Sequence, residues 1–256
     1  MFGLRNTRGS CWVNAALQGV FRIPDLQSRY TNDEADDKNP VEMALQEIWA
    51  SKGDEGLKDF YECVKTETMP AGENIGDSHE LLEFLCDKVP FLDKLMRFKV
   101  GNSVRCNNPE CSYKDTVSDT MTEFSIAPTK PGMSVSAAIV ETVTPFVIDD
   151  WKCEKCSQKG CTKQLLLNTF PQVLVFHMTS LRTTVSYPAI LVVNRIKYAL
   201  VGVVCFSGNH WFTYGRDLPP GKPWHKFDDA RVQSFDGTSF PLVDTMRLLM
   251  YYRLNE

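Results

Sequence analysis

Four cysteines in two pairs place the strongest constraint on how this chain can fold. Cys106 and Cys111 flank the Pro-containing turn CNNPEC, and Cys153 and Cys156 flank a second turn, CEKC. Each turn can present two sulfurs from one backbone bend, so the pairs can supply four thiolates to a single tetrahedral Zn²⁺. Two segments that are distant in the sequence must then meet at one point.

The predicted zinc is structural. Four cysteine ligands leave no open position for water, and a site of this kind contributes on the order of 10 kcal/mol to folding. Cys161 lies close enough in the sequence to compete as a ligand. The segment HELLE at 79–83 lacks the second histidine of the H-E-x-x-H motif, so a zinc protease is excluded.

Composition narrows the class of protein. The 256 residues are 43% apolar and 23% charged, which is enough to bury a sizeable core. The net charge of −4 argues against a general nucleic-acid binder. The sequence has neither a run of eighteen apolar residues nor a signal-peptide pattern. We therefore expect no membrane insertion, a location in the cytoplasm or nucleus, and reduced thiols among the nine cysteines.

The order of predicted elements indicates an α+β fold. Helical periodicity predicts helices at 11–21, 41–50, 56–65 and 75–89, with Pro24 ending the first and a solvated acidic loop at 31–40. Asp77 or Ser78 caps the last of these helices. Beyond Phe98 strands dominate, as in 165–178, 197–206 and 224–235. Helices thus come first, then a cysteine-bearing β insert and a closing β region.

Cys11 is the candidate nucleophile. It follows the loop GLRNTRGS and opens a predicted helix. Unpaired backbone N–H groups and the helix dipole favour a thiolate at such a position. The ordinary alternative is a small buried side chain in the core, so the decision depends on catalytic partners elsewhere in the chain.

His210 and Asp228 are the partners that the sequence favours. Of the four histidines, His210 follows a predicted strand and a Gly turn, and Phe227-Asp228-Asp229 lies on the next predicted strand. A hairpin would hold the imidazole and a carboxylate side by side. Cys11, His210 and Asp228 then act as nucleophile, base and orienting group, and Asp229 is the second candidate for the acidic role.

Several of these stretches resemble one family, the ubiquitin-specific proteases, which are papain-like cysteine peptidases that cut after ubiquitin's C-terminal glycine. Residues 3–18 are similar to its Cys box, and residues 210–214 with 224–232 to its His box. Residues 77–81 resemble its Q-x-D-x-x-E-F/L helix, and the paired cysteines its zinc-bearing fingers. Residues 170–174 and 198–204 resemble its palm strand and the strand before the His box. The matches span nearly the whole chain.

The resemblance implies a single papain-like catalytic domain over 1–256, with a helical thumb at 1–97, zinc-bearing fingers at 98–165 and a β-rich palm at 166–256. It also implies a cysteine-dependent deubiquitinase that acts as a monomer on ubiquitin or ubiquitin-conjugated proteins. The structural zinc would be held by the four cysteines at 106, 111, 153 and 156.

Further site residues are implied by the same resemblance. Asn6 matches the family's oxyanion-hole asparagine. Asp77 and Glu80 match an acidic pair that receives arginines of ubiquitin's tail, although first-turn acids also complement a helix dipole. Asn209 and Trp211 depart from the Gly and Tyr usual beside the histidine, which implies a narrower tunnel for the Gly-Gly tail.

Two alternatives stay open. The first is a protease for another ubiquitin-like modifier such as SUMO, against which the acidic pair argues. The second is a catalytically silent scaffold that binds ubiquitin. Arg8, where the family usually has Gly, and Asn209 keep the scaffold open, whereas the complete set of catalytic residues argues for an enzyme.

Overall fold

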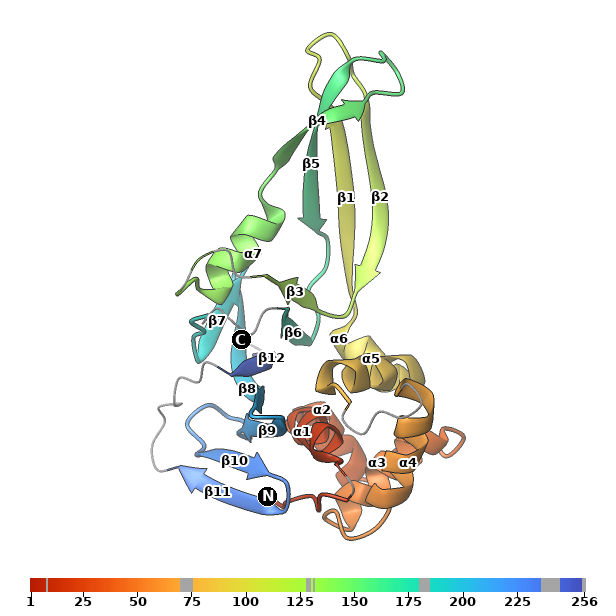
Figure 1. Cartoon of the computed structure of the whole chain (residues 1–256), viewed down its shortest axis with the longest axis vertical. Helices are drawn as coiled ribbons and strands as arrows, with labels where there is room; N and C mark the ends of the chain where they lie inside the picture. The colour runs from red at the N-terminus through yellow and green to blue at the C-terminus, as the bar shows by residue number, and fades with distance from the viewer. Residues whose placement is uncertain are drawn as a thin grey trace.

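Helices and two β-sheets divide the chain into three parts, as the computed structural model shows (Figure 1). The structure describes residues 1–7, 9–69, 76–127, 130, 132–179, 185–235 and 245–254. Helices gather at one end, a large sheet lies beside them, and a narrow sheet of long strands projects away from both (Figure 1). The mixed α+β architecture expected from the sequence is confirmed.

The helical part holds six of the described helices. They are α1 (Cys11–Val20), α2 (Pro24–Thr31), α3 (Pro40–Ala50), α4 (Leu57–Thr68), α5 (Ser78–Lys88) and α6 (Pro90–Met96). All ten residues of α1 are buried, and none is charged, so this helix lies at the centre of the molecule. The others bury an apolar face and leave most of their charged residues outside, although Glu42 of α3 is buried and pairs with Arg29 at 2.6 Å.

Prolines at the first turns of helices explain why the sequence analysis missed a helix. Pro24, Pro40 and Pro90 each occupy the first turn of a helix, where a missing N–H costs nothing and the fixed φ suits the helix. Pro24 therefore ends the pattern of α1 but begins α2, which the sequence did not predict. Asp77 caps α5 as expected, and its carboxylate accepts a hydrogen bond from His79 N at 2.8 Å.

The narrow sheet is built from four described strands in the order β2-β1-β5-β4. They are β1 (Phe98–Cys106), β2 (Lys114–Met121), β4 (Phe146–Lys152) and β5 (Lys159–Leu167), and neighbours run antiparallel. Seven of the eight residues of β2 are exposed, and so are Phe146 and Val147 of β4. The sheet has little core of its own at its far end.

The large sheet forms the rest of the chain. Its described strands run in the order β11-β10-β9-β8-β12-β6-β3, and β7 pairs with β8. They are β3 (Phe124–Ile126), β6 (Val173–Met178), β7 (Ile190–Val193), β8 (Ile196–Ser207), β9 (His210–Gly215), β10 (Trp224–Asp228), β11 (Arg231–Phe235) and β12 (Met246–Arg253). Both β3 and helix α7 (Val135–Val143) come from the stretch between β2 and β4, where the sequence indicated only strands.

The two faces of the large sheet carry two hydrophobic cores. One face packs on the helices through residues such as Val175 and Val204, and the other packs on α7 and the base of the narrow sheet. Helix α1 can approach β8 closely because Gly202 Cα faces Gly19, where added side chains would crowd the Met250 side chain. Thr213 on β9 also donates a hydrogen bond to the Ala15 carbonyl, which fixes α1 against this strand.

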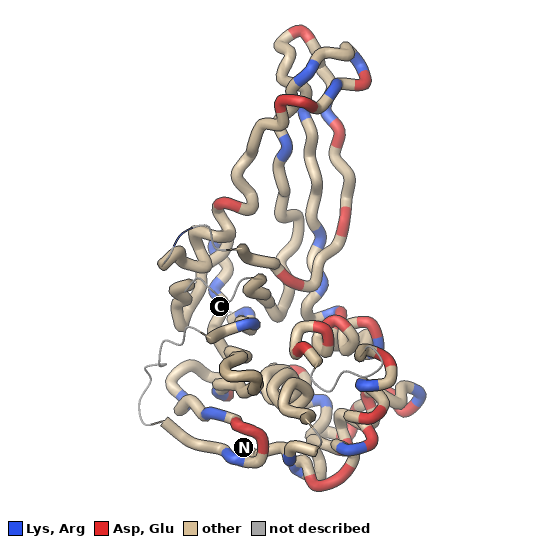
Figure 2. The backbone as a smooth tube through the Cα atoms, viewed as in Figure 1, with Lys and Arg blue, Asp and Glu red and all other residues tan. Residues whose placement is uncertain are grey.

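Charged residues are spread over the outside of all three parts. Figure 2 shows acidic and basic residues interspersed along the helices and the narrow sheet, without a continuous run of basic residues in the described part of the chain. An acidic turn after β10 lies beside the N-terminal segment (Figures 1 and 2). Within the described ranges, every helix is too short or too polar to cross a membrane.

Candidate functional site

Cys11 lies in the first turn of α1 with only 5% of its surface exposed. Burial raises the pKa of its thiol, and the negative charge of Asp229 acts in the same direction. Backbone N–H groups of Trp211, Trp12 and Cys11 itself point to the sulfur and lower the pKa, but less than burial raises it. The N–H groups at the helix start thus act in the direction expected from the sequence, but they do not by themselves offset burial. A nearby cation is needed.

His210 and Asp228 lie side by side on neighbouring strands. His210 begins β9, Asp228 ends β10, and these strands pair antiparallel. The imidazole Nε2 lies 2.7 Å from Asp228 Oδ1. Because Nε2 faces the carboxylate, Nδ1 is the ring nitrogen left for another partner. Trp211, the next residue, directs its N–H toward the Cys11 sulfur, so the start of β9 adjoins the first turn of α1.

The Asp228 carboxylate has a second cationic neighbour. Lys226 Nζ donates a hydrogen bond to Asp228 Oδ2 at 2.6 Å. Although partial burial opposes the effect, the bonds from Lys226 and His210 hold the pKa of Asp228 below its usual value. The carboxylate is therefore ionised at neutral pH and can stabilise a protonated His210.

Hydrogen bonds hold the Asn6 side chain in the loop that precedes α1. Its side-chain oxygen accepts hydrogen bonds from Gly9 N at 3.2 Å and Ser10 N at 3.1 Å. Its Nδ2 donates to Asp229 Oδ2 at 2.9 Å, which leaves one N–H of this amide for a ligand. Arg8, the departure from the family pattern in this loop, lies outside the described residues.

Asp229 connects the N-terminal loop, α1 and the turn after β10. Its Oδ1 accepts a hydrogen bond from Asn14 Nδ2 at 2.8 Å, and its carbonyl accepts one from Leu4 N at 3.0 Å. Its Oδ2 lies 3.9 Å from His210 Nε2, farther than Asp228. Sequence reasoning gave Asn14 no role. The one available signal was an amide inside an otherwise apolar helix, which must find partners when buried.

The predicted tail-binding residues lie along the start of α5 and the turn before β9. Asp77 is the half-buried cap of α5, and Glu80 is exposed in its first turn. Asn209 has φ of +63° in the two-residue turn between β8 and β9, a conformation that Asn tolerates. Trp211 is 3% exposed and packs on Phe206, so its ring belongs to the core and not to an open tunnel wall.

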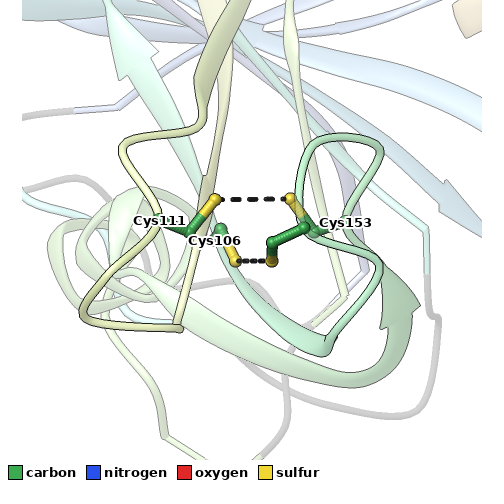
Figure 3. Close-up of side chains that lie close together, drawn as sticks. Cys106, Cys111 and Cys153 are labelled. Atoms are coloured by element: carbon green, nitrogen blue, oxygen red, sulfur yellow. Dashed lines mark hydrogen bonds between the residues drawn. The ribbon is translucent and has the colours of Figure 1, made fainter.

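The four predicted metal ligands meet at the far end of the narrow sheet (Figure 3). The Cys106 and Cys156 sulfurs are 3.7 Å apart, and those of Cys111 and Cys153 are 3.8 Å apart. These separations exceed a disulfide bond and match the edge of a tetrahedron with metal–sulfur bonds of about 2.3 Å. The cluster can therefore hold a metal ion. Cys161 faces Cys106 across β1 and β5, yet its sulfur is not part of the cluster.

Comparison with known proteins decides the family. The model of the family described as ubiquitin carboxyl-terminal hydrolase matches residues 2–251. The chain belongs to the ubiquitin carboxyl-terminal hydrolase family. The family expected from the Cys box and His box is confirmed.

Relatives within the ubiquitin carboxyl-terminal hydrolase family are distant. Ubiquitin carboxyl-terminal hydrolase 2 of Bos taurus is 23% identical, with 98% of this chain and 55% of the relative covered. The Gallus gallus protein of the same name is 25% identical, with 61% and 51% covered. The chain thus spans about half the length of these relatives.

Solved structures share the fold of this chain. A chain of the SAGA DUB module Ubp8/Sgf11/Sus1/Sgf73 bound to monoubiquitin matches with a TM-score of 0.83 at 19% identity. A chain of the same module bound to ubiquitin aldehyde matches with a TM-score of 0.79 at 18% identity. They cover all of this chain and 69% and 70% of those chains.

A second polar cluster in this chain was not predicted from the sequence. His79 of α5 stacks on His177 of β6, with ring centroids 3.7 Å apart. Glu123, just before β3, lies 2.8 Å from His79 Nε2 and 3.5 Å from His177 Nδ1. Nearly parallel rings cannot both point their lone pairs at one ion, so the cluster is better suited to joining the helices to the sheets than to binding metal.

The Glu123 cluster gives a prediction for stability. Despite burial, the hydrogen bonds from His177 and His79 lower the pKa of Glu123 from its usual 4.5 to about 2. A shift of this size corresponds to about 3 kcal/mol. We expect Glu123→Gln to lower the free energy of unfolding by about 3 kcal/mol at pH 6, measured by urea denaturation. The matched control Glu83→Gln, 61% exposed and 3.9 Å from His79, should cost less than about 0.5 kcal/mol.

The pH dependence of this effect has a defined sign. The lowered pKa of Glu123 makes its contribution complete above about pH 4.5, with loss as pH falls toward about 2. Although burial opposes it, Glu123, Glu83 and Asp77 raise the pKa of His79, so the imidazolium contribution is complete below about pH 6.5 and fades as pH rises through the raised value. The difference between wild type and Glu123→Gln should thus be smaller at pH 8.5 than at pH 6. Equal differences would contradict this account.

Proposed function

We propose that this chain is a cysteine-dependent deubiquitinase that hydrolyses the peptide or isopeptide bond after the C-terminal glycine of ubiquitin. The observation that carries the proposal is the convergence of Cys11, His210 and Asp228 on one site within a ubiquitin carboxyl-terminal hydrolase domain. The structural relatives bound to monoubiquitin and to ubiquitin aldehyde support the same substrate.

In the proposed mechanism His210 takes the Cys11 proton through Nδ1. The resulting ion pair supplies the cation that the buried thiolate needs, and Asp228 stabilises the imidazolium from the side of Nε2. The thiolate attacks the glycine carbonyl, and the free N–H of Asn6 binds the oxyanion. His210 then protonates the leaving amine as the C–N bond breaks and a thioester remains.

Water completes the proposed reaction. His210 accepts a proton from the water as its oxygen attacks the thioester carbonyl, and Cys11 leaves as a thiolate. The products are the C-terminal carboxylate of ubiquitin and the free enzyme. Asn6 stabilises the second oxyanion as it does the first, because Asp229 and the 9–10 backbone keep its amide in place.

We further propose that three regions of the chain have different roles in binding ubiquitin. The thumb at 1–97 and the palm at 166–256 enclose the tail, with Asp77, Glu80 and Asn209 next to its path and Trp211 supporting this region from the core. The fingers at 98–165 hold one structural zinc through the four clustered cysteines and support the body of ubiquitin. Since β3 and α7 join the large sheet, the fingers proper are the four strands β1, β2, β4 and β5. The enzyme acts as a monomer inside the cell, where thiols stay reduced.

The test uses ubiquitin with an electrophilic C-terminus, in parallel with the same probe built on SUMO. We expect one ubiquitin adduct per chain by intact mass for wild type and none for Cys11→Ala. Cys63→Ala is the matched control, because Cys63 is an exposed cysteine outside the site, and it should react like wild type. A SUMO adduct alone would mean that the substrate is SUMO and not ubiquitin. Absence of any adduct from folded, zinc-loaded protein would contradict the enzyme and favour a catalytically silent scaffold that binds ubiquitin.

A further inference from the structure

Arg247 is a partly buried cation beside Asp77, at the start of β12. It is the second residue of β12, and its side chain is 14% exposed. Asp77 Oδ2 is 3.9 Å from its guanidinium, beyond hydrogen-bond distance. Among the described residues, none accepts a hydrogen bond from this side chain. The guanidinium has five N–H donors, so a ligand that brings acceptors can bind to it.

The position of Arg247 points to the kind of ligand. On the helical side, Asp77 is followed by Ser78, whose hydroxyl donates to the Trp12 carbonyl at 2.8 Å, and preceded by Gly76, which abuts the Trp12 ring. Trp12 is the neighbour of Cys11. The pair of Asp77 and Arg247 therefore lies close to the nucleophile, at the boundary where the helices face the large sheet. This boundary is called the seam below.

The sheet side of the same seam leads toward the narrow sheet. Leu248, next to Arg247, lies opposite His177 in the pairing of β12 with β6. His177 stacks on His79 above Glu123, at the base of the narrow sheet. Thus the seam runs from the narrow sheet past Arg247 to Cys11. A segment extended along this line would lie beside Arg247 on its way to the sulfur.

We propose that Arg247 is a substrate-binding residue that donates hydrogen bonds to main-chain carbonyl oxygens of the extended C-terminal tail of the substrate. The proposal rests on the proposed function, since it requires a tail in this seam. An extended chain directs carbonyls to alternate sides along its length, so acceptors come within reach of a guanidinium at the seam wall. When no tail is bound, Asp77 balances the charge of Arg247.

The same contact changes how the acidic residues select a tail. Asp77 and Glu80 carry two negative charges, and Arg247 offsets one of them beside Asp77. Selection for a basic side chain then falls mainly on Glu80, which is exposed one turn away. Arg247 thus binds the backbone of the tail, whereas Asp77 and Glu80 recognise its side chains.

Steady-state kinetics with ubiquitin carrying a fluorogenic C-terminal amide test the proposal. We expect Arg247→Met to raise KM by about 10-fold or more, with kcat within about 2-fold of wild type, because hydrogen bonds from a charged donor are lost in binding. Arg247→Lys keeps the positive charge but loses the planar guanidinium with its paired N–H donors. Its KM should lie between those of wild type and Arg247→Met. Arg253→Met, at the far end of the same strand, is the matched control and should match wild type.

The outcomes separate this proposal from the proposed function. A KM for Arg247→Met that is unchanged would overturn the binding role, and a lowered KM would show that Arg247 only competes with the tail for Asp77. Failure of wild type to cleave the substrate or to form the ubiquitin adduct would instead overturn the proposed function. If Arg247→Met does not fold, Arg247→Lys decides, because a wild-type KM for that folded variant is equally contrary to recognition by the guanidinium fork.

Discussion

Replacing Asp228 with alanine is expected to lower kcat/KM for a ubiquitin substrate by about 10²- to 10⁴-fold, whereas Asp228→Asn keeps most of the activity. The reason is the 2.7 Å contact with His210 Nε2, which fixes the imidazole and leaves Nδ1 for Cys11. An amide oxygen accepts the same N–H, as in Cys-His-Asn sites, but a methyl group cannot. Turnover of ubiquitin with a fluorogenic C-terminal amide measures all three proteins.

The neighbouring Asp229 serves as the comparison. Its carboxylate lies 3.9 Å from His210 Nε2 but only 2.9 Å from Asn6 Nδ2, so its effect should come through the oxyanion donor. We expect Asp229→Ala to add little to the loss caused by Asn6→Ala, while Asp228→Ala should add its full effect. If Asp228→Ala left turnover unchanged and Asp229→Ala abolished it, the orienting role would belong to Asp229.

Local sequence signals explain the parts of the site that could be predicted. His210 and Asp228 were paired because a strand, a Gly turn and a second strand favour a hairpin, and β9 and β10 do lie next to each other. The start of α5 followed from Asp77 at an N-cap position and the apolar spacing after it. The cysteine pairs required no knowledge of the strands, because four sulfurs around one ion impose their own geometry.

Other features depend on contacts between distant parts of the chain. The Asn6–Asp229–Asn14 network joins the first residues to a turn near the end, with Asp229 at φ of +52°, and no local pattern indicates it. The raised pKa of Cys11 has the same origin, because burial under β9 outweighs the start of the helix.

Helices α6 and α7, like α2, were missed for local reasons. Pro90 begins α6 immediately after α5 ends, so a residue that usually marks a helix end here marks a new start. In α7 the β-branched sequence VSAAIVETV favours a strand by propensity. The Ser134 cap, which accepts from Ala137 N, and burial of Val135 and Ile139 against the large sheet override that preference.

Removal of metal from the cysteine cluster is expected to unfold the far end of the narrow sheet and to leave the helices and large sheet folded. The strands there bury little apolar surface, since β2 is almost entirely exposed, while a four-cysteine zinc site contributes on the order of 10 kcal/mol. Hydrogen exchange with and without a zinc chelator should show loss of amide protection in β1, β2, β4 and β5, with α1 and β8 still protected.

Metal content by native mass measurement supplies the control for this experiment. Wild type should carry one zinc per chain, Cys106→Ser should carry none, and Cys161→Ala should still carry one, because the Cys161 sulfur lies outside the cluster. Loss of zinc from Cys161→Ala would make Cys161 a ligand after all. Unchanged protection of the narrow sheet without metal would mean that strand pairing alone holds it, and the four thiolates would then have no structural role. Because Cys106 ends β1 while Cys153 directly follows β4, the metal would join two sequence-distant parts of this sheet at its far end.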